Sequence, residues 1–160
     1  SRAGRGHGLG TFRADRYGQA GRSGRFVQGS LAVAQHGVLR GMHYQWPNPQ
    51  GKLVYVLHGE VFDVAVDIRR DSPTFGRWVG ITLSADNHHQ LWIPPGFAHG
   101  FCVTSAAALV AYKCTDYYAP DCERAIRWDD AEIGIVWPVS APLVSGKDAA
   151  ATTLQASVAV

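Results

Sequence analysis

Several side chains of this sequence are of the types that move protons next to a carbonyl group. His43 can remove a proton from carbon if a carboxylate orients its imidazole and stabilises the imidazolium that forms. Such a carbon is acidic only when the developing enolate is stabilised, and the ammonium of Lys52 has the charge for that task. Arg40 carries a fork of donors that suits phosphate, and a phenol could return a proton on the opposite face. The set predicts proton abstraction next to a ketone in a phosphorylated substrate.

The spacing around His43 and Lys52 follows a metal-binding motif of cupin barrels, but the side chains are wrong for a metal. That motif runs Gly, five residues, His-x-His, three or four residues, Glu, six residues, Gly. Gly37, His43 and Gly59 keep their places. Gln45 stands in place of the second His, and Lys52 stands in place of the Glu after a longer gap. Because an ammonium repels a cation, we expect no metal, and the pocket suits an anion or a polarised carbonyl.

The second cupin motif, Pro-x-Gly-x-x-His, occurs at residues 94–99, although the flanking Gly and Asn of the full pattern are missing. Two half-motifs in this order predict an all-β cupin double-stranded β-helix, a jelly-roll barrel with a few short helices. They also predict that His43, Lys52 and His99 point into one pocket. A poor metal site made by His43, Gln45 and His99 is the alternative, against which Lys52 argues.

The sequence between residues 26 and 137 has the pattern of many short strands. Residues 60–69 alternate with period two, which places Asp63 on a partly polar face, as expected for the lining of a pocket. Further strands are expected at 53–57, 78–83, 90–93, 100–104 and 107–115, with turn sequences at 71–74, 84–87 and 94–96.

The two ends of the chain differ from this middle part. Residues 1–24 are rich in Gly and Arg, and we expect them to be flexible or ordered only by contact with something else. Residues 149–160 are expected to form a short helix or a frayed tail. The length of 160 residues predicts a single domain over 1–160.

Composition excludes several function classes. With 46% hydrophobic residues the chain can build a core, and its net charge of +2 is too small and too scattered for nucleic-acid binding. No apolar run approaches the ~18 residues of a membrane span, and the chain has no start typical of a signal peptide. The three cysteines show no metal-type spacing, which fits a reducing cytoplasm.

Ten strings of residues resemble one known family, the dTDP-4-dehydrorhamnose 3,5-epimerases. Among them are VLRGMHYQ at 38–45, QGKLV at 50–54 and GFAHGF at 96–101. The others lie at 59–69, 72–76, 90–94, 112–118, 126–130, 135–138 and 145–149, so the resemblance covers roughly residues 26–150. It implies a cofactor-independent conversion of dTDP-4-dehydro-6-deoxy-D-glucose to dTDP-4-dehydro-L-rhamnose in dTDP-L-rhamnose biosynthesis. It also implies a cytoplasmic homodimer that exchanges a strand across its interface.

The same resemblance implies a role for each matching residue. His43 matches the general base of the family, and Asp148, in the late Ser-x-Lys-Asp string, matches its carboxylate partner. Lys52 matches the lysine that faces the 4-keto oxygen, and Tyr112 matches the acid that protonates C5 from the other side. Arg40 matches the arginine that binds the diphosphate. From the residues alone, Tyr112 could equally be a core aromatic.

The remaining family positions imply contacts with the substrate. They are His99 and Asp63 in the pocket lining, Tyr118 near the thymine, and Gln28, Gln45 and Arg5. Without the resemblance, Asp63 could equally be a structural carboxylate.

The chain departs from the family pattern in two strings near its start. Of the D-x-R-G-x-F-x-E string it keeps only Arg5 and Gly6, and of the Q-D-N-x-S-x-S string only Gln28, with Ser30, Ala32 and Ala34 at the other polar positions. Each lost hydrogen bond to a phosphate could cost ~1.5–3 kcal/mol, so substrate recognition is expected to be weaker or altered. Three alternatives therefore stay open: a single-carbon epimerase or ketoisomerase of a related nucleotide sugar, a non-catalytic sugar-binding cupin, and a metal-dependent cupin.

Overall fold

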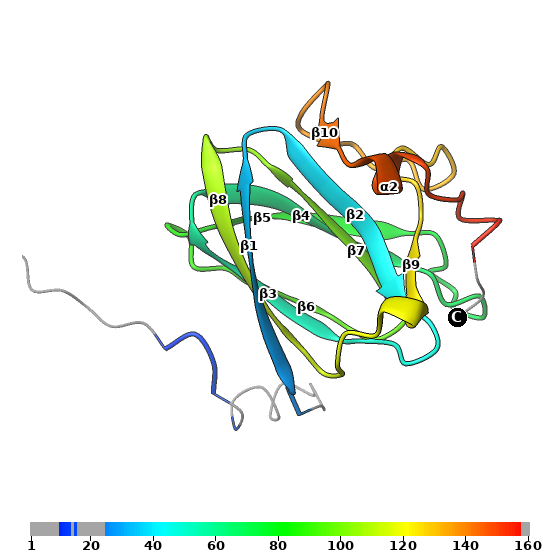
Figure 1. Cartoon of the computed structure of the whole chain (residues 1–160), viewed down its shortest axis with the longest axis horizontal. Helices are drawn as coiled ribbons and strands as arrows, with labels where there is room; N and C mark the ends of the chain where they lie inside the picture. Colours follow the sequence, from blue (N-terminus) through cyan, green and yellow to red (C-terminus); the bar gives the residue numbers. More distant parts are fainter. Residues whose placement is uncertain (1–9, 14, 16–24, 158–160) are drawn as a thin grey trace, which may run out of the picture.

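The computed structural model describes residues 10–13, 15 and 25–157, and two facing β-sheets make up most of this part (Figure 1). One sheet has the order β1 (Gln28–Gln35), β8 (Ala107–Cys114), β3 (Lys52–His58), β6 (Gln90–Ile93). The other has the order β10 (Leu143–Val144), β2 (Val38–Gln45), β7 (Phe97–Val103), β4 (Glu60–Asp67), β5 (Trp78–Ser84), and β9 (Glu123–Ala125) pairs with β2. All neighbouring strands are antiparallel except β10 and β2. This arrangement confirms the predicted jelly-roll barrel.

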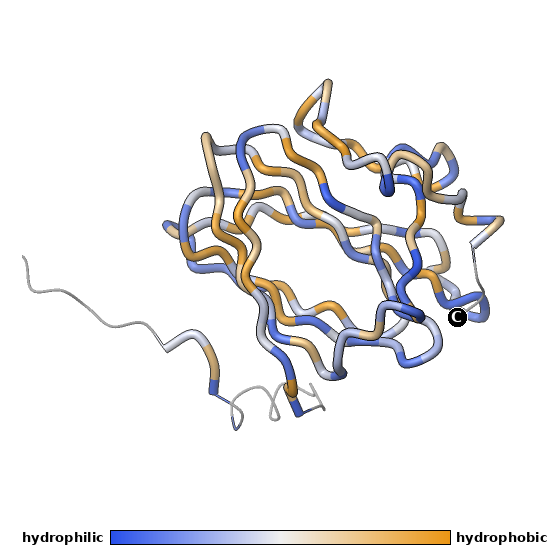
Figure 2. Tube along the Cα trace, viewed as in Figure 1, coloured by the Kyte–Doolittle hydropathy of each residue, from blue (hydrophilic) through white to orange (hydrophobic). Residues whose placement is uncertain are grey.

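Period-two alternation along the strands divides the apolar residues between two clusters. On β4, Val61 and Ala65 face a cluster between the sheets, whereas Val64 and Val66 face a second cluster on the outer side of the β2–β7–β4 sheet. The alternation predicted for residues 60–69 is therefore confirmed, and Figure 2 shows hydrophobic positions recurring along the strands. Each fully buried Val or Leu side chain contributes about 1.5–3 kcal/mol. The inner cluster leaves one end of the barrel free for polar side chains.

Most expected strands differ from the observed ones by one or two residues at an end, and two differences are larger. Strand β7 begins at Phe97 rather than Gly100, so His99 lies within a strand. At the other end of the chain, α2 (Gly146–Ala149) ends where the helix or tail was expected to begin. The expectation of a frayed tail is wrong for the described part, because Thr152 forms a β-bridge with Ile126 and the side chain of Leu154 is buried.

The helical segments that the structure describes are short. Besides α2, a 3-10 helix covers Pro120–Cys122. No helix among the described residues is both long and apolar enough to cross a membrane. Most of residues 1–24, including Arg5, lies outside the described residues.

Candidate active site

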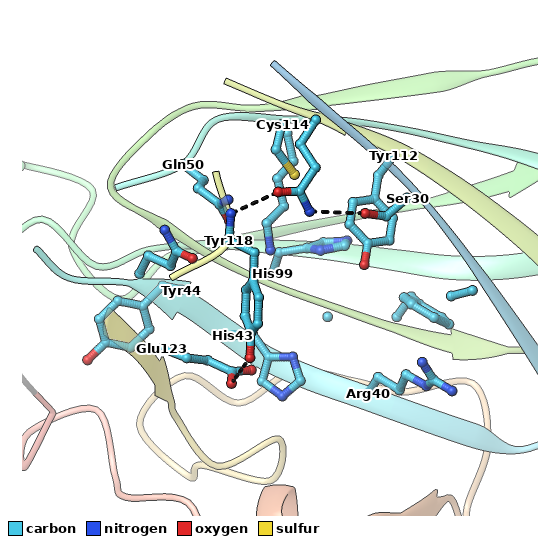
Figure 3. Close-up of a pocket in the computed structure, with 16 residues that line it drawn as sticks. Ser30, Arg40, His43, Tyr44, Gln50, His99, Tyr112, Cys114, Tyr118 and Glu123 are labelled. Atoms are coloured by element: carbon cyan, nitrogen blue, oxygen red, sulfur yellow. Dashed lines mark hydrogen bonds between the residues drawn. The ribbon is translucent and has the colours of Figure 1, made fainter. Parts of the chain in front are cut away.

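A cavity of about 390 Å³ opens between the two sheets, and the side chains that line it come from both (Figure 3). Strands β2 and β7 contribute Arg40, His43 and His99, which lie on one wall. The opposite wall comes from β1, β3 and β8 and carries Gln28, Ser30, Ala32, Lys52, Tyr112 and Cys114. Tyr118 and Glu123 lie beside the cavity in the segment that follows β8.

The imidazole of His43 is hydrogen bonded to a buried carboxylate. Its Nε2 lies 2.6 Å from Oδ1 of Asp148, whose side chain is only 3% exposed. Since a carboxylate accepts and does not donate, Nε2 carries the proton and Nδ1 of the neutral ring is the basic nitrogen. Helix α2 fixes the carboxylate, because the backbone N–H of Asp148 donates to Oγ of its N-cap, Ser145, at 3.1 Å. An imidazole oriented by a buried carboxylate is thus present at the cavity wall.

Lys52 lies on the opposite sheet at the start of β3. Its Cα is paired with that of Ile93 on β6 and that of Cys114 on β8, so the lysine has neighbours on both sides. Burial lowers the pKa of Lys52, and the negative charge of Asp63 partly opposes that shift. An ammonium in such a low-dielectric position stabilises a developing oxyanion more strongly than it would in water.

Tyr112 also faces His43 across the cavity. It lies on β8 between Ser30 of β1 and Val54 of β3, and its hydroxyl points into the cavity (Figure 3). A group held between His43 and Tyr112 would therefore meet a base on one side and a phenol on the other. That arrangement can remove a proton from one face of a carbon and return one to the opposite face.

Comparison with known proteins agrees with this geometry. The family model for dTDP-4-dehydrorhamnose 3,5-epimerase matches residues 2–156, which includes all but the first residue of the divergent segment 1–24. The chain belongs to this epimerase family. An epimerase of that name from Neisseria gonorrhoeae is 57% identical over 151 residues, which are 94% of this chain and 46% of the relative. Another from Shigella flexneri is 58% identical over 129 residues, 80% of this chain and 71% of the relative. The chain thus spans less than half the length of the Neisseria relative.

Solved structures of the epimerase family share the fold. The dTDP-6-deoxy-D-glucose-3,5-epimerase of Legionella pneumophila, in complex with dTDP-4-keto-L-rhamnose, superimposes with a TM-score of 0.88 at 56% identity. That match covers 91% of this chain and 78% of the Legionella chain. The two-sheet barrel is therefore the cupin-type fold of the dTDP-4-dehydrorhamnose 3,5-epimerases.

In this member of the epimerase family, His99 and Asp63 form a second histidine–carboxylate pair. Nε2 of His99 lies 3.0 and 3.1 Å from the two carboxylate oxygens of Asp63. His99 lines the cavity, whereas Asp63 is fully buried behind it and is not among the lining residues. The expectation that Asp63 lines the pocket is therefore corrected: its contact is with His99, which it orients.

The two glutamines expected to bind substrate hold the segment that carries Tyr118. Oε1 of Gln28 accepts the backbone N–H of Tyr118 at 2.8 Å, and Oε1 of Gln45 accepts that of Ala119 at 2.9 Å. Gln45 also donates to the carbonyl oxygens of Asn48 and Tyr117. Both glutamines line the cavity, and their side-chain amides hold the backbone of the segment around Tyr118 at the cavity edge.

Sequence reasoning missed two charged residues beside the cavity, Glu123 and Lys147. Glu123 accepts hydrogen bonds from the Tyr118 hydroxyl at 2.9 Å and from the Lys147 ammonium. Burial of Glu123 raises its pKa, but these two hydrogen bonds together with the nearby charge of Lys147 lower it, and the net shift is downward. The hydrogen bond to Glu123 also raises the pKa of Tyr118. No spacing signal marks Glu123 on its short strand, whereas Lys147 could have been found as the neighbour of Asp148.

The departures from the family strings affect the cavity unequally. Ser30 and Ala32 line it on β1, and Ser30 accepts a hydrogen bond from Gln28 at 3.3 Å. Ala32 and Ala34 both belong to the inner apolar cluster, but Ala34 does not line the cavity. Only two of the three replaced positions can therefore touch a ligand in this cavity.

Proposed function

We propose that the protein catalyses the cofactor-independent 3,5-epimerisation of dTDP-4-dehydro-6-deoxy-D-glucose to dTDP-4-dehydro-L-rhamnose. The observation that carries the proposal is the His43–Asp148 pair on one wall of the cavity, with Lys52 and Tyr112 on the other. In this proposal His43 is the base, Lys52 the enolate stabiliser and Tyr112 the acid. Family membership supports the same reaction.

The chemistry follows from the position of the ketone in the substrate. Both C3 and C5 are attached to the C4 carbonyl carbon, so one stabilised enolate oxygen makes the protons on both carbons acidic. Nδ1 of His43 removes the proton, Asp148 stabilises the imidazolium, and Lys52 holds the negative oxygen. Tyr112 delivers a proton from the opposite face at C5, which inverts that carbon. At C3 a proton that comes from solvent replaces the one taken by His43 and inverts that carbon in turn.

The nucleotide part of the substrate is assigned to a guanidinium and an aromatic ring of the cavity lining. Arg40 is exposed on β2, and its guanidinium can bind two phosphate oxygens at once. Tyr118 offers an aromatic face. Gln28 accepts its backbone N–H, and Gln45 holds the backbone of its two neighbours, Tyr117 and Ala119. The Legionella relative binds a dTDP sugar, which is the class of ligand assigned here.

Solvent isotope exchange tests the proposed reaction. Incubation with dTDP-4-dehydro-6-deoxy-D-glucose in deuterated water should place deuterium at both C3 and C5, as measured by NMR of the product. Deuterium at C3 alone would select a single-carbon epimerase. Absence of exchange in folded protein that binds the nucleotide sugar by calorimetry would instead select a non-catalytic sugar-binding cupin.

We also propose that the protein is a homodimer in which β1 lies at the interface. Leu31 and Val33 on β1 are 65% and 72% exposed, and Leu57 on β3 is 47% exposed. The register places Leu31 beside Ala111 and Val33 beside Leu109, so these side chains share the outer face of the four-stranded sheet. A second copy would bury this apolar face. Because β1 is an edge strand, exchange of a strand with the partner would also bring partner residues near each cavity.

Replacing Val33 with aspartate should convert the dimer to a monomer, because a carboxylate cannot be buried unpaired in an apolar interface. Sedimentation equilibrium should give twice the 17.3 kDa chain mass for the wild type and a single chain mass for Val33→Asp. Val136→Asp is the matched control, since Val136 is 75% exposed outside this sheet. A monomeric wild type, or a Val33→Asp protein that stays dimeric, would contradict the assigned interface.

A further inference from the structure

Strand β2 contains a bulge between Arg40 and His43. Its register with β7 pairs Arg40 with Phe101 and His43 with His99, so β2 advances three residues while β7 advances two. Gly41 and Met42 therefore oppose the single residue Gly100. In a regular strand, residues three apart point to opposite faces. Because of the bulge, Arg40 and His43 both line the cavity, while Met42 is buried in the outer apolar cluster.

The bulge requires glycine at two positions, one on β2 and one on β7, where the two backbones come unusually close. Gly41 has a φ of 132°, a conformation that residues with a side chain rarely adopt. A Cβ at Gly41 would lie 2.5 Å from Cα of Gly100. A Cβ at Gly100 would lie 2.7 Å from the carbonyl oxygen of Arg40 and 2.7 Å from Sδ of Met42. Any side chain at either position must push β2 and β7 apart.

The bulge also directs a backbone donor at the partner of the base. The N–H of Gly41 donates to Oδ2 of Asp148 at 3.2 Å in a buried position, while Oδ1 accepts from His43. Both oxygens of one carboxylate are thus held by β2, one by Gly41 within the bulge and the other by His43 directly after it. The Gly41 N–H fixes the rotation of the carboxylate plane, and that plane orients the imidazole.

We infer that Gly41 and Gly100 are positioning residues for the proposed reaction. Their close approach allows the bulge, and the bulge points the side chains of Arg40 and His43 into the same cavity. The Gly41 N–H also holds the carboxylate of Asp148 in its hydrogen bond with His43. Gly100 lines the cavity with its backbone, and neither glycine has a side chain that could take part in the chemistry. Their effect passes through the base and the phosphate anchor, and a misplacement of about 1 Å at such groups can cost 10²-fold in rate.

Two variants test the bulge and the Gly41 N–H separately. Gly100→Ala should displace Arg40 and His43 together, lowering kcat for deuterium exchange about 10²-fold and raising KM for the nucleotide sugar. An amide-to-ester replacement at Gly41 deletes only the N–H. It should lower kcat about tenfold and leave KM within threefold of the wild type, because Arg40 keeps its place. In both proteins the low-field proton resonance of the His43 Nε2–H, held by Asp148, should shift or broaden.

The matched control is Gly80→Ala, a strand glycine of β5 whose added Cβ would meet the ring of Phe62. It should lower Tm while leaving kcat and the His43 resonance unchanged. Wild-type kcat in Gly100→Ala, or an unchanged His43 resonance in the Gly41 ester, would overturn the inference. The resonance is read without substrate, so a wild type that shows no exchange would refute the proposed function and leave this test valid.

Discussion

His43→Asn should lower the rate of deuterium incorporation at C5 by about 10²–10⁴-fold, the contribution expected of a general base. Asparagine keeps a polar side chain at position 43 but has no group that can take up a proton from carbon. The rate is measured by NMR in deuterated water at saturating substrate. His89→Asn, on an exposed histidine, is the matched control and should exchange at the wild-type rate. Exchange within tenfold of the wild type in His43→Asn would rule out His43 as the base.

Asp148→Asn should give a loss of similar size, for a reason that the hydrogen bonds define. The Gly41 N–H holds one oxygen at position 148, so an asparagine there would place its oxygen on Gly41 and its amide nitrogen toward His43. An N–H facing Nε2 forces the imidazole proton onto Nδ1, and the basic nitrogen toward the substrate is lost. A wild-type rate in this variant would show that the carboxylate does not set the tautomer.

Lys52→Met should also lower kcat strongly, by about 10²–10³-fold, with a smaller change in KM. Methionine approximates the length of the lysine stem but cannot stabilise the enolate, which carries more negative charge than the ground-state ketone. Lys113→Met is the matched control: Lys113 neighbours Leu53 on the same sheet, and its ammonium lies over the Phe12 ring. Steady-state kinetics of both variants check the prediction, and a Lys52→Met protein within threefold of the wild-type kcat would contradict it.

The thermal stability of the Lys52→Met protein should rise, although its activity should fall. Burial lowers the pKa of Lys52, so holding its ammonium in the folded state costs free energy at every pH below the lowered value. Lys52→Met removes that cost and should raise Tm at neutral pH. As pH rises through the lowered pKa, the wild-type lysine loses its proton, and the difference in Tm should shrink. Activity of the wild type should fall in the same alkaline range, which lies below the ordinary value of 10.5 for lysine. A Tm of Lys52→Met that is lower than that of the wild type at neutral pH would contradict this account.

The sequence was informative where local pattern decides structure. Period-two alternation located β4, and two half-motifs placed His43, Lys52 and His99 at one cavity. The partner of His43 is 105 residues away, and no spacing rule links them, so Asp148 came from family resemblance alone. The case of Asp63 shows what alternation does not predict. Alternation gives the side of the sheet that a residue faces, but it does not show that another side chain, here His99, lies between Asp63 and the cavity.

One signal in the sequence was present but unused. Arg40 and His43 were both expected in one pocket although they are three positions apart, and a regular strand points such residues to opposite faces. A bulge is the usual way to reconcile such a conflict, and Gly41 between them is the residue type that permits it. Glu123 had no comparable signal, because its position depends on where a three-residue strand pairs with β2.

Helix α2, which carries Asp148, comes after all the barrel strands in the sequence, and this order has a consequence for how the site is completed. All strands that wall the cavity end by residue 125, whereas Asp148 belongs to a helix that is translated later. During synthesis the strands that wall the cavity are therefore complete before Asp148 is translated, and at that stage His43 has no carboxylate partner. If His43 is the base, as proposed, the protein becomes active only after the segment that follows β10 docks on β2. A protease that cut between residues 126 and 145 without unfolding the barrel would return the protein to that immature state.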